Sequence, residues 1–368
     1  MPSRIRQPKG FSQSPGQPLR APGAVGPSGG GKRPGGMTGT FSIVAMDPER
    51  REWGVAVASR VLDVGYIVPW MQAEVGAVAT QALTNPHLAP WALQALGEGA
   101  SAQQALDAIL ARDSDPGVRQ VGIVDRHGNA AAHTGASTQA WAGHRTSEAV
   151  SVQGNILVGP EVVERMLSTF QVATGPLAER LLLALEAGEQ AGGDRRGKQS
   201  SALKVVRRNG GYQAVDDRLV DLKVVDQAEP VAELRRLYDQ WQYAFLVEAY
   251  CRLADDEPEC SPLLMRSVRS LLDRALQAPI ASAEVFNNLA WHLALRKKYP
   301  EETLRAAQRA QELAPADADV LDTLAEAWYA AGDAGTAAHW EEQALGLSPG
   351  NEFFQRQLDR FRGAAGPA

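Results

Sequence analysis

The sequence predicts an α+β fold of layered sheets and helices, followed by a region built only from helices. Segments with a β pattern occur in runs and do not alternate strictly with helical segments, which favours α+β layers over a doubly wound parallel sheet. After Pro230 every periodic segment is helical, and two related segments repeat near the C-terminus. We therefore expect a layered domain over 40–228 and a helical-repeat domain over 229–362.

The layered region is expected to open with two pairs of strands. The segments TFSIVA (40–45) and WGVAVAS (53–59) are apolar or alternating and enclose a polar turn, which predicts a hairpin. The segments VGYIVPW (64–70) and EVGAVAT (74–80) indicate a second pair.

Helices and further strands follow in blocks. Ser101 and Gln104 form a potential capping box at the start of one helix, and a turn at Gly128 and Asn129 separates the strands of a second hairpin. The expected elements are helices over 88–99 and 101–113, strands within 118–135 and 149–159, helices over 160–171 and 175–193, and strands over 201–208 and 219–225.

Residues 1–39 differ from the rest of the chain. They are rich in Pro, Gly and Ser and contain Lys and Arg but neither Asp nor Glu, so we expect disorder. They show no apolar core of a secretory signal, which favours a cytoplasmic protein. The segment is either an upstream extension, with Met37 as the true first residue, or a tether or propeptide.

Composition excludes several function classes. The net charge of -6 argues against nucleic acid as the main partner, because phosphate binding needs a basic surface. No apolar run approaches the roughly 20 residues that a membrane helix needs. The two cysteines cannot build a disulfide framework, and the six scattered histidines show no metal spacing, so we expect neither a metal nor a cofactor. P-loop, dinucleotide-binding and G-x-S-x-G motifs are also missing.

The C-terminal repeat resembles tetratricopeptide repeats. Val285 and Val320 are 35 positions apart, and Pro315 and Pro349 are 34 apart. The second copy matches the pattern better, through Leu324, Trp328, Gly332, Ala337, Ala344 and Pro349. Stacked helix pairs present a concave surface, so a protein or peptide partner is expected here.

Thr40 is the main chemical candidate. A threonine hydroxyl is a weak nucleophile that needs a base, and a free α-amino group on the same residue can serve, with a pKa of about 7.7–8.0. This strategy requires a cut directly before Thr40, where Gly39 stands. Glycine tolerates the unusual backbone dihedrals that a self-cleaving bond needs.

An ordered series of motifs from Thr40 to about Leu237 resembles the domain of unknown function 1028 family. The motifs are TFSIVAMDP, GVAVASR, GAVATQALTNP, RQVGIVD with AAHTG, WAGH, VQGNILVGPEVVERM, GPLAERLLLALEAGEQAGGDRRGKQSSALKVV, DLKVVD and PVAELRRL. The resemblance implies the N-terminal nucleophile (Ntn) hydrolase superfamily and its four-layer αββα sandwich. It also implies Thr40 as nucleophile and base, attacking an amide carbonyl and passing through an acyl-enzyme.

The sequence departs from the pattern of that superfamily. A lysine near the threonine is expected, yet no Lys occurs between Lys32 and Lys198, and Ala58 stands where an Asp is usual. We consider Arg60, Asp194 and Arg195 as replacements. In family members Met commonly precedes the Thr directly, whereas Met37 here leaves Thr38 and Gly39 in front of Thr40.

For each further candidate residue we consider a functional role and a structural alternative. Arg60 is expected to clamp a substrate carboxylate or to form an ion pair, and Asn155 to donate to an oxyanion or to end a strand. Gln81 and His133 are expected to line the cleft or to be structural. The remaining candidates are Ser59 and, from the polar loop GGDRRGKQSS, Asp194, Arg195, Gln199 and Ser200.

Two functions fit these observations. The first is a hydrolase of a small amide or peptide that uses Thr40, with a partner-binding repeat domain. The second is a non-catalytic member that binds a ligand or protein. The retained Thr40 and Gly39 favour the first, and the missing lysine favours the second. Homo-oligomerisation is compatible with both.

Overall fold

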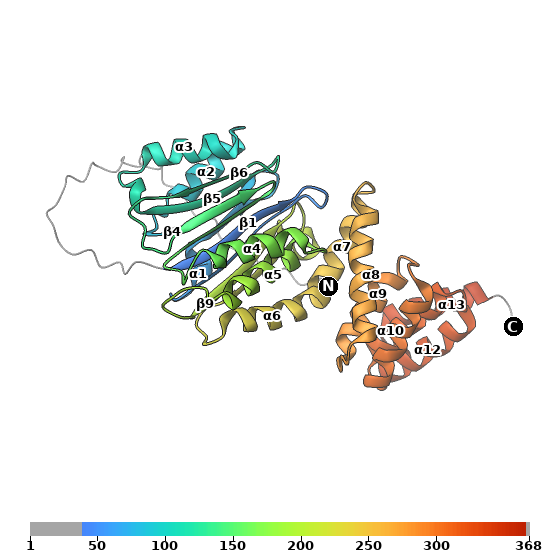
Figure 1. Cartoon of the computed structure of the whole chain (residues 1–368). Helices are drawn as coiled ribbons and strands as arrows, with labels where there is room; N and C mark the ends of the chain where they lie inside the picture. The colour runs from blue at the N-terminus through green and yellow to red at the C-terminus, as the bar shows by residue number, and fades with distance from the viewer. Residues whose placement is uncertain (1–38, 366–368) are drawn as a thin grey trace, which may run out of the picture. The chain divides into compact units, whose positions relative to one another are not determined.

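The computed structural model describes residues 39–365 of the chain. Disorder was expected over residues 1–39, but Gly39 is described and buried; the rest of that segment and the choice of Met37 as a start lie outside the described residues. Within the described part, a mixed α and β region with two sheets is followed by a helical region, as predicted from the sequence (Figure 1).

The first sheet has six strands in the order β10-β9-β2-β1-β8-β7, and every neighbouring pair is antiparallel. Its strands are β1 (Thr40–Asp47), β2 (Glu52–Ser59), β7 (Gly143–Ser147), β8 (Val150–Asn155), β9 (Ser200–Val206) and β10 (Arg218–Val224). The predicted hairpin of β1 and β2 is confirmed. Strand β7 was not predicted, because its sequence GHRTS is polar and lies at the exposed edge of the sheet, where alternation is not needed.

The second sheet has four antiparallel strands in the order β3-β4-β5-β6. They are β3 (Pro69–Gln72), β4 (Gly76–Ala82), β5 (Arg119–Asp125) and β6 (Ala130–Thr134). The prediction of a strand over 64–70 is wrong in its first half, where α1 (Val64–Ile67) forms a helical turn. Asp63 turns the chain with a φ of 45°, and Gly65 packs so tightly on β9 that an added Cβ would lie 2.7 Å from the Cβ of Ala202.

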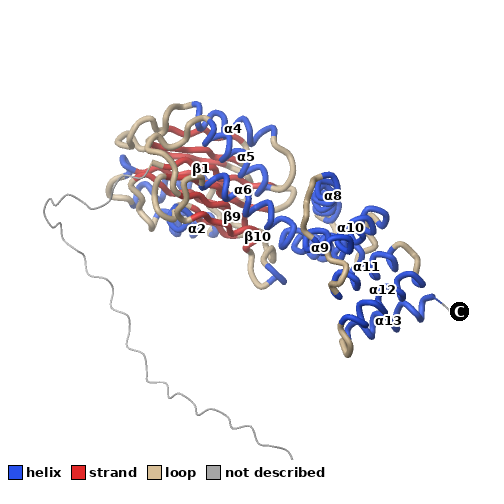
Figure 2. Tube along the Cα trace, turned by 90° about the horizontal axis from the view of Figure 1, so that it is seen from below, coloured by secondary structure: helices blue, strands red, loops and turns tan. Residues whose placement is uncertain are grey.

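Helices cover the outer face of each sheet (Figures 1 and 2). Helices α4 (Glu161–Val172) and α5 (Leu177–Gln190) lie on the six-stranded sheet, and α2 (Leu88–Gly97) and α3 (Ala102–Arg112) lie on the four-stranded sheet. The predicted capping box of α3 is confirmed, because Ser101 accepts from the backbone of Gln104 while the side chain of Gln104 accepts from Ser101. The short helix η1 (Pro116–Val118) directly precedes β5 in the four-stranded sheet.

The space between the two sheets changes from apolar to polar along the strands. Alternate residues of β1 point into it, beginning with Thr40 and Ser42 and continuing with Val44 and Met46. Val44 and Met46 belong to an apolar cluster that also includes side chains of β2 and β4. At the other end of the strands the space is filled by glutamines from both sheets, namely Gln81, Gln120 and Gln153. The start of β1 is therefore a buried polar environment.

The helical region begins with α6 and shares an apolar core with the six-stranded sheet. Tyr250 donates to the Glu52 carboxylate (Oη to Oε1, 2.8 Å), and Trp241 donates to the Leu219 carbonyl at 3.1 Å. The helices are α6 (Pro230–Trp241), the π-helical turn η3 (Gln242–Leu246), α7 (Val247–Asp256), α8 (Ser261–Gln277), α9 (Ala283–Ala294), α10 (Pro300–Leu313), α11 (Ala318–Ala330), α12 (Ala334–Leu347) and α13 (Glu352–Ala365). Among residues 39–365 no helix has the length and apolarity to cross a membrane.

The two repeated segments form two helix pairs, α9 with α10 and α11 with α12. The turn of the second pair contains Gly332 with a φ of 96°. The first pair has no glycine there, and Lys297 and Tyr299 take positive φ values of 51° and 48° instead. Small alanines such as Ala306 and Ala337 are fully buried and allow the paired helices to approach closely.

Candidate active site

Thr40 lies at the start of the central strand β1, with Ser59 of β2 on one side and Asn155 of β8 on the other. Its side chain is buried, with only 1% exposed. The Thr40 hydroxyl donates to Ser59 (Oγ1 to Oγ, 3.1 Å). A hydroxyl in this position has a hydrogen-bonding partner through which its proton can leave.

The carbonyl group of Gly39, directly before Thr40, accepts two hydrogen bonds from side chains. One comes from the Ser59 hydroxyl and the other from Arg196 (Nη2 to O, 2.9 Å). Donors aimed at a carbonyl oxygen polarise the bond and stabilise negative charge that develops on that oxygen. The peptide bond that joins Gly39 to Thr40 therefore lies in an arrangement suited to nucleophilic attack.

Asp194 holds Arg196 in place. The Asp194 carboxylate accepts from the backbone N of Arg196 at 2.9 Å, from its Nε at 3.1 Å and from its Nη2 at 2.7 Å. It also accepts from the backbone N of Arg60 at 3.1 Å. Bidentate arginine–carboxylate pairs have a defined geometry, so the Asp194 side chain fixes the orientation of the guanidinium that reaches Gly39.

The loop that carries Asp194 is tied to the end of β8. Leu157 and Asp194 form an isolated bridge, and the backbone N of Arg195 donates to the Ile156 carbonyl at 2.9 Å. Ile156 has a φ of 54°, which is unusual for a β-branched residue. Such strain persists where the surroundings impose it, and it is common near functional sites.

Side-chain amides support the site from the space between the sheets. Gln81 Nε2 donates to the Thr40 carbonyl at 3.3 Å and to Gln120 Oε1 at 2.9 Å. Asn155 Nδ2 donates to the same Gln120 oxygen at 2.9 Å. Ser42 donates to Gln81 Oε1 at 2.7 Å. This network is buried and satisfied, so it fixes the backbone on both sides of Thr40.

A small cavity of about 90 Å³ adjoins Ser59 and Asp194. Lys198 lies in its wall and pairs with Glu189 (Nζ to Oε1, 3.1 Å) and with Glu229. Burial raises the pKa of Glu189 above its ordinary value, and the hydrogen bond to Glu229 raises the pKa of Lys198. The other lining residues are Phe41, Ala58, Gly192, Gly193, Gly197 and Pro230.

The model of a family of unknown function, DUF1028, matches residues 40–234, which is more than half of the chain. The chain belongs to the DUF1028 family. A crystal structure of protein SPO2555 from Silicibacter pomeroyi, also described as DUF1028, is similar, with 30% identity and a TM-score of 0.51. The likeness covers 55% of this chain and 89% of that chain. No curated protein matches.

Within the DUF1028 domain, five of the predicted site residues gather around Thr40. Ser59 and Asp194 contact Gly39 or its arginine partner, and Gln81 contacts the Thr40 backbone. Asn155 lies opposite Thr40, but its amide donates to Gln120, so the donors on the Gly39 carbonyl come from Ser59 and Arg196. Arg60 is exposed at the rim and donates to the Arg196 carbonyl at 2.7 Å.

Other predicted residues lie farther from this point. His133 sits on the face of the four-stranded sheet that packs against helices, and its ring contacts the Pro116 carbonyl at 2.9 Å. Arg195 is exposed, while its neighbours Asp194 and Arg196 pair with each other. The backbone of Gln199 accepts from Gln227. Ser200 accepts from the backbone N of Val64 and thereby holds the segment before α1.

Arg196 was missed in the sequence analysis of the DUF1028 domain, although its neighbour Arg195 was chosen. A local signal existed: an Asp whose side chain accepts from the backbone two residues later forms an Asx turn. Applied to Asp194, this rule identifies Arg196, and not Arg195, as the residue whose backbone N donates to the carboxylate. Gln120 and Ser42 were also missed. Each is a polar residue on the inward face of a strand, and the sequence does not show which partner on the opposite sheet it bonds to once the sheets pack together.

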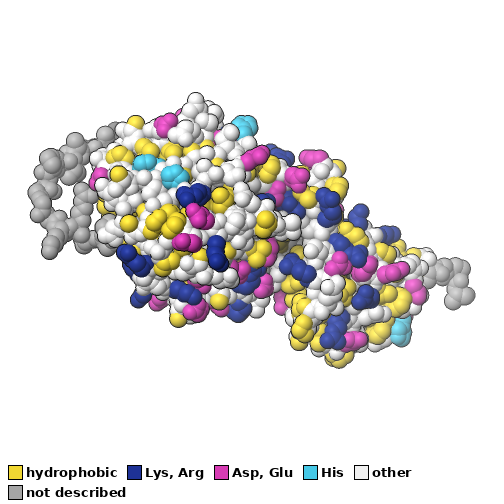
Figure 3. Space-filling view, viewed as in Figure 1, with side chains coloured by type: hydrophobic (Ala, Val, Ile, Leu, Met, Phe, Trp, Pro, Cys, Tyr) yellow, Lys and Arg dark blue, Asp and Glu magenta, His cyan; other side chains and the backbone are white. Residues whose placement is uncertain are grey.

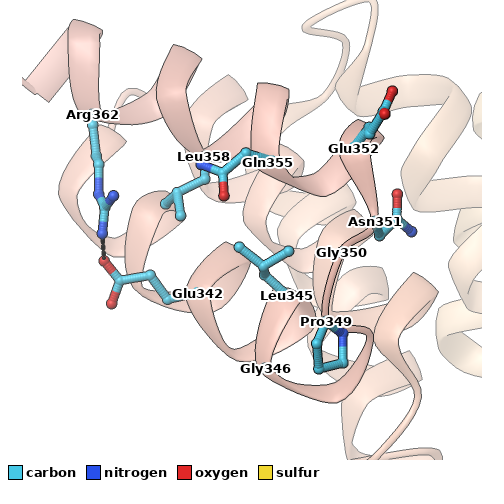
Figure 4. Close-up of a pocket in the computed structure, with 10 residues that line it drawn as sticks. All are labelled: Glu342, Leu345, Gly346, Pro349, Gly350, Asn351, Glu352, Gln355, Leu358 and Arg362. Atoms are coloured by element: carbon cyan, nitrogen blue, oxygen red, sulfur yellow. Dashed lines mark hydrogen bonds and ion pairs between the residues drawn. The ribbon is translucent and has the colours of Figure 1, made fainter.

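Larger hollows lie on the helical region. One of about 650 Å³ lies between α12 and α13, where Glu342 pairs with Arg362 at 2.6 Å (Figure 4). Its lining is exposed apart from the buried Leu358 and the half-buried Leu345 and Asn351, and it contains no buried nucleophile. On the face shown in Figure 3, basic and acidic side chains are interspersed. Glu257, Glu259 and Cys260 approach within 4.8 Å of one another, but Glu257 already pairs with Arg207 at 2.9 Å.

Proposed function

We propose that this DUF1028 protein is an Ntn hydrolase whose nucleophile, Thr40, is exposed by cleavage of the bond between Gly39 and Thr40. One observation carries the proposal. The Gly39 carbonyl oxygen accepts from Ser59 and from Arg196, while the Thr40 hydroxyl donates to the same Ser59. The substrate is a small amide or peptide. The antiparallel sheets with helices on their outer faces serve as an αββα Ntn scaffold.

The contacts supply a route for the cleavage step. Oγ1 of Thr40 attacks the Gly39 carbonyl carbon, and its proton passes to Ser59 while the Ser59 proton passes to the carbonyl oxygen. Arg196 stabilises the negative charge that develops on that oxygen before the proton arrives. The C–N bond then breaks as the proton on the former carbonyl oxygen moves to the Thr40 nitrogen, which leaves an ester on Thr40 and a free α-amine. Water hydrolyses the ester, releases the preceding segment and restores the hydroxyl.

The processed chain then acts on an external amide. The new α-amine takes the hydroxyl proton, since its pKa of about 7.7–8.0 lies near physiological pH. Oγ1 attacks the substrate carbonyl, the leaving amine takes a proton, and water hydrolyses the acyl-enzyme. Arg60 and Arg195, both exposed, are proposed to attract a substrate carboxylate. The helix pairs α9–α12 are proposed to act as a tetratricopeptide-like module for a protein partner.

A second function is favoured by one observation. No Lys occurs between Lys32 and Lys198, and Lys198 itself pairs with Glu189 and Glu229. A domain without a free lysine next to Thr40 fits a non-catalytic binding protein in which Gly39 and Thr40 stay joined.

Intact mass and N-terminal sequencing of the purified protein distinguish the two functions. We expect wild-type protein to begin at Thr40 and Thr40→Ala to retain the preceding residues. Thr146→Ala is a matched control, because Thr146 is an exposed threonine on the edge strand β7. If every wild-type molecule keeps residues before Thr40, the amine-base mechanism is excluded.

A further inference from the structure

We infer that the site selects acyl groups that carry no side chain on their α-carbon, so that its substrates are amides of the glycyl type. The inference rests on the proposed function and adds a substrate class to it. It comes from the space around Gly39, the residue whose carbonyl group the site holds.

Gly39 marks the place that the acyl part of a substrate takes. Cleavage before Thr40 forms an ester between the Gly39 carbonyl and Oγ1, and hydrolysis of a substrate forms an ester between its acyl group and the same oxygen. Both esters need their carbonyl oxygen next to Ser59 and Arg196. The α-carbon of the acyl group is then in the position of the Gly39 α-carbon.

This position leaves no room for an L side chain. A Cβ added to Gly39 would lie 2.8 and 2.9 Å from the two carboxylate oxygens of Asp194, and 2.9 Å from the Cβ of Ile156. These separations are shorter than van der Waals contact between such atoms. Even the methyl group of an L-alanyl substrate would therefore collide with both walls.

The two residues that crowd this position, Asp194 and Ile156, are both held in place. Asp194 is held by three hydrogen bonds from Arg196 and one from the backbone of Arg60. Ile156 is fixed at both backbone groups, because its N donates to the Gln139 carbonyl and its carbonyl accepts from Arg195. Displacing Asp194 would also displace the guanidinium that stabilises the oxyanion, so a bulkier acyl group loses catalysis as well as binding.

Acyl transfer from two activated esters tests the inference. Processed protein that begins at Thr40 is mixed with the p-nitrophenyl esters of N-acetylglycine and of N-acetyl-L-alanine. Oγ1 takes the acyl group, nitrophenolate leaves, and water releases the N-acetylamino acid. Nitrophenolate release is measured above the rate with Thr40→Ala, and the acyl-enzyme is weighed by mass spectrometry. We expect the glycyl ester to react more than about tenfold faster, since pockets discriminate single methyl groups by roughly 10–200-fold.

The outcomes separate this inference from the function on which it rests. Equal Thr40-dependent rates with both esters overturn the glycyl preference and leave the hydrolase in place. Failure of both esters to acylate a chain with a free Thr40 overturns the proposed function and the inference together.

Processing of the full chain provides a second test. Gly39→Ala is expected to slow release of the preceding segment by more than about tenfold. Gly97→Ala is the matched control, because a Cβ at Gly97 meets nothing within 4 Å. Melting temperatures show whether Gly39→Ala folds, and the ester assay needs no variant at this position. Processing of Gly39→Ala at the wild-type rate would overturn the inference.

Discussion

The Nη2 atom of Arg196 lies 2.9 Å from the carbonyl oxygen of Gly39. The same guanidinium is held by the Asp194 carboxylate, so its position does not depend on solvent. Gly39 is buried and its carbonyl already accepts from Ser59, so the guanidinium adds a second, charged donor to an oxygen that one hydrogen bond would satisfy. We regard this contact as the strongest structural support for chemistry at Thr40.

Replacing Arg196 should slow cleavage of the bond between Gly39 and Thr40 while the protein still folds. Arg196→Gln removes the charged donor from the Gly39 carbonyl, and loss of one such donor costs roughly 100- to 1000-fold in rate. The rate is read as the fraction of unprocessed chain over time by intact mass. Arg195→Gln, an exposed neighbour of the same type, should process normally. Equal rates for both variants would show that Arg196 is structural.

Removing the Ser59 hydroxyl should block the proton route. In Ser59→Ala the Thr40 hydroxyl loses its acceptor and the Gly39 carbonyl loses one donor, so we expect processing to slow by roughly 100-fold or more. Ser168→Ala, at an exposed serine on α4, serves as the control. The same mass measurement applies. Full processing of Ser59→Ala would assign the proton transfer to another group.

The sequence pattern anticipated Thr40 and its neighbours on adjacent strands because hairpins and alternation determine local register. Ser59 and Thr40 face each other for that reason. The contact of Arg196 with Gly39 joins residues 157 positions apart and depends on how one loop closes. For His133 the sequence left a cleft role and a structural role open, and the parity of β6 separates them: Thr134 points between the sheets and contacts Gln120, whereas His133 points to the helices.

The polar network could not be foreseen for a related reason. Gln81, Gln120 and Asn155 stand on three strands of two different sheets, and each looks like an isolated polar residue in an apolar segment. Only the face-to-face arrangement of the sheets shows that their amides satisfy one another. Periodicity identifies which face of a strand is buried, but it does not identify the partner across the layer.

Glu52 is predicted to make stability depend on pH. Burial raises the pKa of its carboxyl group from 4.5 to about 7, and its contact with Tyr250 joins the sheet to α7. The folded state keeps this proton up to about pH 7, while the unfolded chain releases it near its ordinary value. The stability that Glu52 contributes is therefore complete below that ordinary value and is lost as the pH rises to about 7, by about 3 kcal/mol.

Denaturant unfolding over this pH range checks the Glu52 prediction. Glu52→Gln cannot ionise, so its stability relative to wild type should rise with pH across the same window. Glu49→Gln changes an exposed carboxyl on the neighbouring turn and should follow the wild-type curve. Parallel curves for wild type and Glu52→Gln would contradict the assigned titration.

A second pair of buried carboxyl groups should make the last helix pair sensitive to alkaline pH. Asp322 of α11 and Glu341 of α12 are 5% and 0% exposed and lie within hydrogen-bonding reach of each other. The neighbouring Glu326 pairs with Arg360, which leaves no cation for Glu341 among the described contacts. Burial, together with the negative charge of Asp322, raises the pKa of Glu341, so the pair retains a proton at neutral pH.

Loss of this proton at higher pH would place two unpaired charges between α11 and α12. Because the unfolded chain releases this proton near the ordinary glutamate pKa of 4.5, the stability that the pair contributes is complete below that pH and is lost progressively as the pH rises to about 9. Glu341→Gln supplies a permanent hydrogen-bond donor to Asp322 and should be more stable than wild type in alkaline buffer, by about 1–3 kcal/mol. Thermal unfolding by circular dichroism at neutral and alkaline pH measures this difference. Glu342→Gln, which alters the adjacent exposed carboxyl, should leave the pH dependence unchanged, and the same result for Glu341→Gln would show that the pair carries no such proton.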